Sequence, residues 1–143
     1  MVSTLFAAWC LMALSVAIHA GGVAGALRHL RRQSIESTAR FWPATWLFVL
    51  VAAWMVFLHL LEIAVWGAFY AWMGAMVDIT SALYFSTVTY TTTGYGDLVL
   101  PEKWRLVGGV EALTGILMSG WSTGFFIAVV NRLYNPAGTT ART

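Results

Sequence analysis

Apolar residues gather in three long runs along the chain, and polar and charged residues are concentrated between them. The runs cover residues 3–27, 43–66 and 106–130. A helix of about 25 residues is roughly 37 Å long, which is enough to cross a bilayer with some tilt. The pattern therefore predicts an all-α membrane protein with three transmembrane helices.

A shorter segment, residues 80–91, lies between the second and third runs and reads TSALYFSTVTYT. It is too short to span a bilayer, and a lipid-facing helix would not carry so many hydroxyl groups, so we expect it to be a helix buried in protein. Asp78 and Thr80 are both suited to cap its start. In the preceding connector, residues 67–79, we expect Gly67 and Gly74 to act as helix breakers.

Composition supports a membrane protein and excludes several other classes. Of 143 residues, 59% are hydrophobic and 10% are charged, whereas a soluble domain of this length would carry far more charge. The net charge of +2 is too small to indicate a nucleic-acid partner, and a lipid bilayer is the expected environment. The lone Cys10 cannot form an intrachain disulfide. We recognise no nucleophile–base pair, metal-ligand cluster or phosphate loop in the sequence, so no enzymatic function is expected.

Basic residues predict the orientation in the membrane. The loop of residues 28–42 is rich in arginine, and such short loops belong in the cytoplasm; its basic residues are Arg28, Arg31, Arg32 and Arg40. The N-terminus is then outside, and the C-terminus, with the short polar tail 133–143, is cytoplasmic. Because no positive charge precedes residues 3–27, we expect an uncleaved helix there rather than a secretory signal.

Aromatic and histidine side chains give further local expectations. Tryptophan and tyrosine favour membrane interfaces, so we expect an inner belt of Trp42 and Trp46 and an outer belt of Trp66, Tyr70 and Trp72. His19 lies within the first apolar run. For His19 we expect a neutral side chain bonded to a neighbouring helix, although intramembrane ionisable residues are also functional candidates.

The segment Thr91–Asp97 reads TTTGYGD and directly follows the short buried helix. Backbone carbonyls can replace the water around an alkali ion if they all point inward, and glycine at alternate positions permits the required backbone angles. The segment resembles the selectivity filter of potassium channels, TVGYG, with Thr93 in place of the usual Val or Ile. The resemblance covers roughly residues 43–132. It implies the following elements: outer helix 43–66, pore helix 80–91, filter 92–97 and inner helix 106–130.

This resemblance implies a potassium-selective channel, with residues 1–27 as an additional peripheral helix. One filter loop can surround only one side of an ion, and the family assembles four copies, so a homotetramer is expected. Potassium ions would be bound by filter carbonyls and by the Thr92 hydroxyl, without an organic cofactor; the carbonyls are those of Thr92, Thr93, Gly94 and Tyr95. The expected location is a prokaryotic plasma membrane.

The resemblance also suggests which residues support the filter. Tyr95 should point away from the pore and pack against pore-helix aromatics, and Asp97, which follows Gly96, should bond Tyr84. Glu62, three residues after His59, is either a local polar partner of that histidine or a brace behind the filter. Glu111 should face the back of the pore helix, where an unpaired charge is costly. Its expected partners are pore-helix or filter hydroxyls (Thr87, Thr89, Tyr90 or Thr93); the alternative is a water-bonded residue near the outer vestibule.

Within the inner helix, Gly115 aligns with the family's hinge glycine. Residues that recur at helical spacing should line the cavity: Ala112, Ile116, Ser119, Thr123 and Ile127. Gly120 and Gly124 permit close helix approach, for packing or for a gate. Three other functions remain open: a less selective monovalent cation channel, because of Thr93; a subunit of a potassium uptake transporter; and a non-conducting scaffold, which would leave TTTGYGD unexplained.

Overall fold

A computed structural model describes residues 2–32 and 41–134, and these residues form helices joined by short connections. The elements are α1 (Val2–Arg31), α3 (Phe41–Trp72), α4 (Ile79–Tyr90), the 3-10 turn η1 (Glu102–Trp104) and α5 (Arg105–Tyr134). Three helical segments are long and apolar enough to cross a membrane: 2–31, 41–72 and 102–134. The predicted all-α membrane fold is therefore confirmed. Most of the predicted basic loop, with Arg40, and most of the predicted tail lie outside the described residues.

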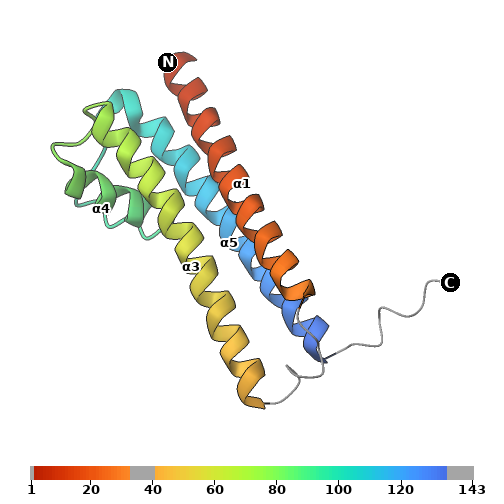
Figure 1. Ribbon diagram of the computed structural model, residues 1–143. Coiled ribbons are helices and arrows are strands. Elements are labelled where there is room, and N and C mark those ends of the chain that lie inside the picture. The colour runs from red at the N-terminus through yellow and green to blue at the C-terminus, as the bar shows by residue number, and fades with distance from the viewer. Residues whose placement is uncertain (1, 33–40, 135–143) are drawn as a thin grey trace.

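The three long helices run side by side, and the short α4 packs at one end of this bundle (Figure 1). α1 and α5 end, and α3 begins, at the opposite end from α4. Helix α4 contacts both α3 and α5, and α1 contacts the same two long helices. This arrangement encloses one face of α4 and leaves the loop that follows it on the outside of the single chain.

All three long helices extend beyond their predicted limits. Arg28 and Arg31 lie in the last turn of α1 rather than in a loop. Helix α3 continues through Gly67, so the prediction that this glycine breaks the helix was wrong. A Cβ at Gly67 would lie 3.1 Å from the Leu83 Cα, a tighter contact than most Cβ atoms make, so glycine favours the close crossing of α3 and α4. Gly74 follows the end of α3, with φ at +60°.

The aromatic belts are only partly as predicted. Trp42, Trp46 and Trp72 are exposed on the surface of the chain, but Trp66 and Tyr70 are fully buried. Protein partners satisfy these buried polar atoms, because the Trp66 Nε1 donates to the Ser15 Oγ at 3.0 Å and the Tyr70 hydroxyl donates to a carboxylate on α5. The Trp66 bond also joins α1 to α3.

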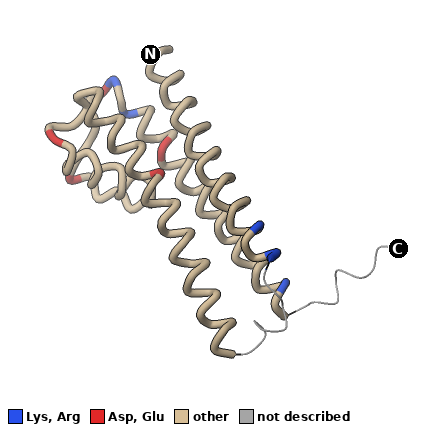
Figure 2. The backbone as a smooth tube through the Cα atoms, viewed as in Figure 1, with Lys and Arg blue, Asp and Glu red and all other residues tan. Residues whose placement is uncertain are grey.

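Charged residues of the described chain separate along the bundle (Figure 2). The acidic residues lie in the half that carries α4. Basic residues occur at both ends: Lys103 in η1 and Arg105 at the start of α5 lie at one end, and the others lie near the ends of α1 and α5. The middle of the bundle therefore carries no Lys or Arg among the described residues.

Candidate functional site

Helix α4 is fixed at its start by a side-chain cap. The Asp78 carboxylate accepts hydrogen bonds from the Ser81 backbone nitrogen at 2.8 Å and from the Ser81 hydroxyl at 2.9 Å. These bonds lower the pKa of the Asp78 carboxyl below its usual range. Twelve residues later α4 ends at Tyr90, and its C-terminal carbonyls give that end a partial negative charge. The loop 91–97 begins at this end.

The backbone of loop 91–97 alternates between two conformations. Thr92, Gly94 and Gly96 have positive φ angles of 59°, 52° and 77°, whereas Thr93 and Tyr95 do not. Successive N–H groups converge on one side in such alternating backbone. A non-glycine residue in this region costs about 1–3 kcal/mol and persists only where its surroundings hold it.

Hydrogen bonds to α4 hold the beginning of this loop. The backbone nitrogens of Thr92 and Gly94 donate to the carbonyls of Thr89 and Val88, at 2.9 and 3.0 Å. These bonds oppose the strain at Thr92.

The hydroxyl of Thr93 has a partner within the same chain. The Thr91 hydroxyl donates to the Thr87 carbonyl at 2.7 Å, and its oxygen lies 3.0 Å from the Thr93 Oγ1. Because Thr91 has already donated its proton, Thr93 is the donor in this contact. The replacement of Val or Ile by Thr thus adds one local hydrogen bond.

Tyr95 is 72% exposed in the single chain. The prediction that it packs against pore-helix aromatics is therefore not met within one chain. Phe85, one of these aromatics, is buried against Tyr70, with the two ring centroids 5.4 Å apart. The hydroxyl of Tyr84, another of these aromatics, is bonded to Asp97 and not to Tyr95.

The predicted bond between Tyr84 and Asp97 is present. The Tyr84 hydroxyl donates to the Asp97 Oδ2 at 2.7 Å, which ties the end of the loop to the middle of α4. This hydrogen bond lowers the pKa of the Asp97 carboxyl and raises the pKa of the Tyr84 hydroxyl, since it favours the ionised acid and the protonated phenol.

Glu111 is fully buried and joins three helices. Its Oε1 lies 2.5 Å from the Ser86 hydroxyl of α4, and its Oε2 accepts from the Tyr70 hydroxyl of α3 at 2.8 Å. A pore-helix hydroxyl is thus a partner, as expected, but Ser86 takes the place of the four predicted candidates. Full burial also excludes the alternative of a water-bonded residue at the vestibule.

The hydrogen bonds of Ser86 indicate the protonation state of Glu111. Its hydroxyl oxygen lies within bonding distance of two acceptors, Glu111 Oε1 and the Ile63 carbonyl at 2.9 Å. A hydroxyl has one proton to donate. Both contacts are hydrogen bonds when Ser86 donates to Ile63 and a protonated Glu111 donates to Ser86.

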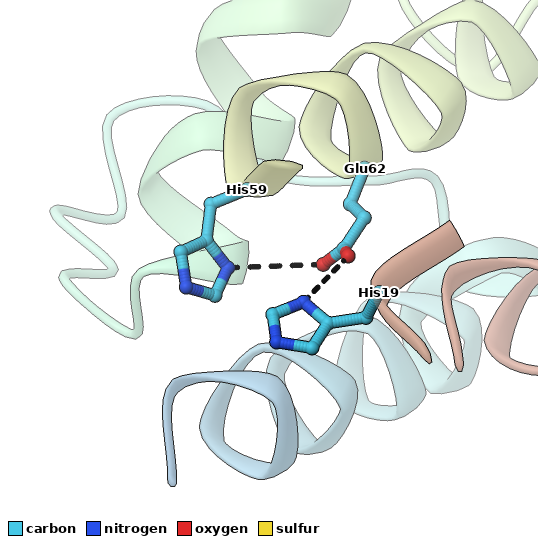
Figure 3. A group of neighbouring side chains, drawn as sticks. All are labelled: His19, His59 and Glu62. Carbon is cyan, nitrogen blue, oxygen red and sulfur yellow. Dashed lines mark hydrogen bonds and ion pairs between the residues drawn. The ribbon is translucent and has the colours of Figure 1, made fainter. Parts of the chain in front are cut away.

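Glu62 forms a second buried cluster, which contains His59, its expected polar partner, and the last residue of α4. Its Oε2 lies 3.7 Å from the His59 Nδ1 and accepts a hydrogen bond from the Tyr90 hydroxyl. Because Tyr90 ends α4, the brace acts on the end of the helix and not on the loop itself. His19 of α1 joins the cluster through its Nδ1, 3.0 Å from the Glu62 Oε1 (Figure 3). Two histidines and a carboxylate thus come together, although no ligand cluster was recognised in the sequence.

The contact between α5 and the end of α4 depends on Gly115. A Cβ at this position would lie 1.9 Å from the Tyr90 carbonyl oxygen. Glycine is therefore required here for close approach, whether or not it also acts as a hinge. The strip of α5 predicted to line a cavity is largely exposed in the single chain; it comprises Ala112, Ile116, Ser119, Thr123 and Ile127.

Comparison with known proteins identifies a family for most of the chain. A family model described as "Ion channel" matches residues 44–132, which is more than half of the chain. The potassium voltage-gated channel protein Shal of Drosophila melanogaster is 37% identical over 60 residues, covering 41% of this chain and 10% of that protein. The chain thus spans only about a tenth of that curated relative. No solved structure matches.

Proposed function

We propose, since the chain belongs to the potassium-channel pore-domain family of ion channels, that it forms a potassium-selective channel with passive flux across a membrane. The observation that carries the proposal is the alternating backbone of Thr92, Gly94 and Gly96. It supports a row of carbonyls directed to one side, between two helices of membrane-spanning length.

In this proposal, potassium ions exchange their hydration water for main-chain oxygens of the filter, residues 92–97. The ligands are the carbonyls of Thr92, Thr93, Gly94 and Tyr95, with the Thr92 hydroxyl at the inner end. The C-terminal end of α4 adds partial negative charge beside this row. Tyr84, Glu62 and Glu111 act as filter supports through their bonds to Asp97, Tyr90 and Ser86.

We propose a homotetramer in the lipid bilayer, because one carbonyl row can enclose an ion from one side only. The exposure of residues 91–97 in the single chain supports this assembly. The exposed strip of α5 would then line the cavity, and α1 would lie outside the pore helices. The arginines near the ends of α1 and α5 favour a cytoplasmic location for that end and an external N-terminus.

Thr93 is compatible with potassium selectivity in this account. Its hydroxyl is bonded to Thr91, so the Thr side chain resembles Val in shape without requiring a new partner. A Thr93→Val exchange removes one hydrogen bond, worth about 0.5–1.5 kcal/mol. We expect it to change the potassium-to-sodium permeability ratio by less than about tenfold, since about 1.4 kcal/mol corresponds to a factor of ten.

Ion flux into liposomes that contain the purified chain tests the proposal. We expect potassium flux to exceed sodium flux, and Gly94→Ala or Gly96→Ala to abolish it, because both positions have left-handed backbone. Gly74→Ala is the matched control, since Gly74 has a similar φ of +60° outside the filter. Wild-type flux in both filter variants would refute the filter assignment.

A further inference from the structure

A group of potential metal ligands lies where α1 packs against α3, and it includes no residue of loop 91–97. It consists of His19 from α1 and of His59 and Glu62 from α3 (Figure 3). One ligand atom from each residue lies within 4.8 Å of the other two. His19 and Glu62 are fully buried, and the His59 side chain is 20% exposed.

The spacing of these atoms suits a small divalent ion. The His19 Nδ1 is 3.0 Å from the Glu62 Oε1, and the His59 Nδ1 is 3.7 Å from the Glu62 Oε2. Tetrahedral zinc binds nitrogen and oxygen at about 2.0–2.1 Å, which places neighbouring ligand atoms roughly 3.3–3.4 Å apart. One observed distance is shorter and the other longer than this value, and they involve the two different oxygens of Glu62. Binding therefore requires the side chains to shift so that all three ligand atoms reach one ion.

Ser122 of α5 orients both imidazoles. Its Oγ lies 3.0 Å from the His59 Nε2 and 3.2 Å from the His19 Nε2. A serine hydroxyl has two acceptor lone pairs, so it can accept from both Nε2–H groups at once. In this tautomer both Nδ1 atoms carry a lone pair that can bind a metal. The His19 Nδ1 lies 3.0 Å from the Glu62 Oε1. The His59 Nδ1 lies 3.2 Å from the Tyr90 hydroxyl, whose contact the metal would replace. Ligating histidines almost always donate their other ring N–H to such an acceptor.

The carboxylate also has an outer partner. The Tyr90 hydroxyl donates to the Glu62 Oε2, which leaves the Oε1 directed at His19. Imidazole nitrogens favour zinc and related transition metals, whereas alkali ions and magnesium prefer oxygen ligands. The negative charge of Glu62 offsets part of the charge of a dication inside the bundle.

We propose that His19, His59 and Glu62 form a binding site for one divalent transition-metal ion of the zinc type in each chain. A water molecule completes the coordination. The ion joins α1 to α3 directly, and it reaches α5 and the end of α4 through Ser122 and Tyr90. The role of the first helix is then to supply a ligand that the pore helices lack.

Cobalt(II) is the probe, because it can replace zinc and absorbs visible light when bound tetrahedrally. The purified full-length chain, without a polyhistidine tag, is stripped with a chelator and titrated with Co²⁺. We expect one bound ion per chain by elemental analysis, a visible band, and loss of that band on addition of Zn²⁺.

Variants assign the site to these residues. We expect His19→Gln to abolish the band and His29→Gln, the same exchange at an exposed position of α1, to retain it. Ser122→Ala removes the shared acceptor, and we expect weaker binding by about 10–100-fold at unchanged stoichiometry.

Absence of bound Co²⁺ in the wild-type chain would overturn the proposal, as would equal binding by the wild-type chain and the His19→Gln variant. If the latter does not fold, the wild-type titration and the Ser122→Ala affinity decide the matter. The assay detects metal and not ion flux, so it can fail while the channel proposal stands.

Discussion

Gly115→Ala probes the contact on which the position of the filter depends. A Cβ at residue 115 would lie 1.9 Å from the Tyr90 carbonyl oxygen and 2.8 Å from its carbonyl carbon. Both atoms belong to the backbone, so no side-chain rotation can relieve the overlap. Tyr90 is the last residue of α4, immediately before loop 91–97. The added methyl group must therefore move the beginning of the filter or α5.

The size of the effect follows from the distances. Real Cβ atoms essentially never approach other atoms closer than 3.0 Å, so the two elements must separate by at least 1.1 Å (3.0 less 1.9). Overpacking a well-packed site costs about 1–3 kcal/mol, and a rigid backbone obstacle places this site at the upper end. Alanine regains up to about 1 kcal/mol of helix propensity. We expect a net destabilisation of about 2 kcal/mol.

Two assays of purified protein check this prediction: thermal unfolding in detergent, and potassium against sodium flux in liposomes. We expect Gly115→Ala to lower the unfolding temperature and to reduce potassium flux. Gly109→Ala on the same helix is the control, because a Cβ there meets no atom within 4 Å and should be neutral or slightly stabilising. Equal stability and equal flux in the two variants would show that the contact does not position the filter.

Two further predictions concern the carboxylates around α4. Glu111→Gln should cost less than about 1 kcal/mol, because its amide can donate to Ser86 and accept from Tyr70. Glu111→Val leaves the Tyr70 hydroxyl without an acceptor, at about 1–3 kcal/mol, while Ser86 keeps its bond to the Ile63 carbonyl; equal unfolding temperatures for the two variants would contradict this. The hydrogen bond from Tyr84 lowers the pKa of Asp97. Its stabilising contribution is therefore fully present above the usual carboxyl pKa of about 4, and it is lost as the pH falls through the lower pKa of the folded protein. Tyr84→Phe should therefore shift any acid-induced loss of potassium flux to higher pH, and an unchanged pH profile would refute the coupling.

The fold could be predicted because the features that indicate it can be read along the sequence without knowing any contact between helices. Length and apolar character alone identify three spanning helices, and the alternate glycines after a short hydroxyl-rich helix identify the loop. The bond between Tyr84 and Asp97 followed from a resemblance that aligns the two residues. These features need no knowledge of how separate helices are rotated against each other.

The wrong predictions concern contacts that depend on how one helix is rotated against another. Neighbouring residues on a helix point about 100° apart, so choosing Ser86 rather than Thr87 as the partner of Glu111 requires the register of α4 against α5. Gly67 looks like a breaker until Leu83 is known to cross it.

Trp66, which was expected at the interface, is buried because α1 supplies Ser15 as its partner. The histidine–glutamate cluster was missed for a similar reason. His19 is 43 residues from Glu62, and only the docking of α1 brings them together.

The most direct test of the central claim is the reversal potential of the purified chain in a planar bilayer, with potassium on one side and sodium on the other. If carbonyl rows from four chains surround a dehydrated ion, current should reverse at a voltage that shows strong preference for potassium. A current that reverses near zero, or the absence of any current from folded protein, would contradict the account.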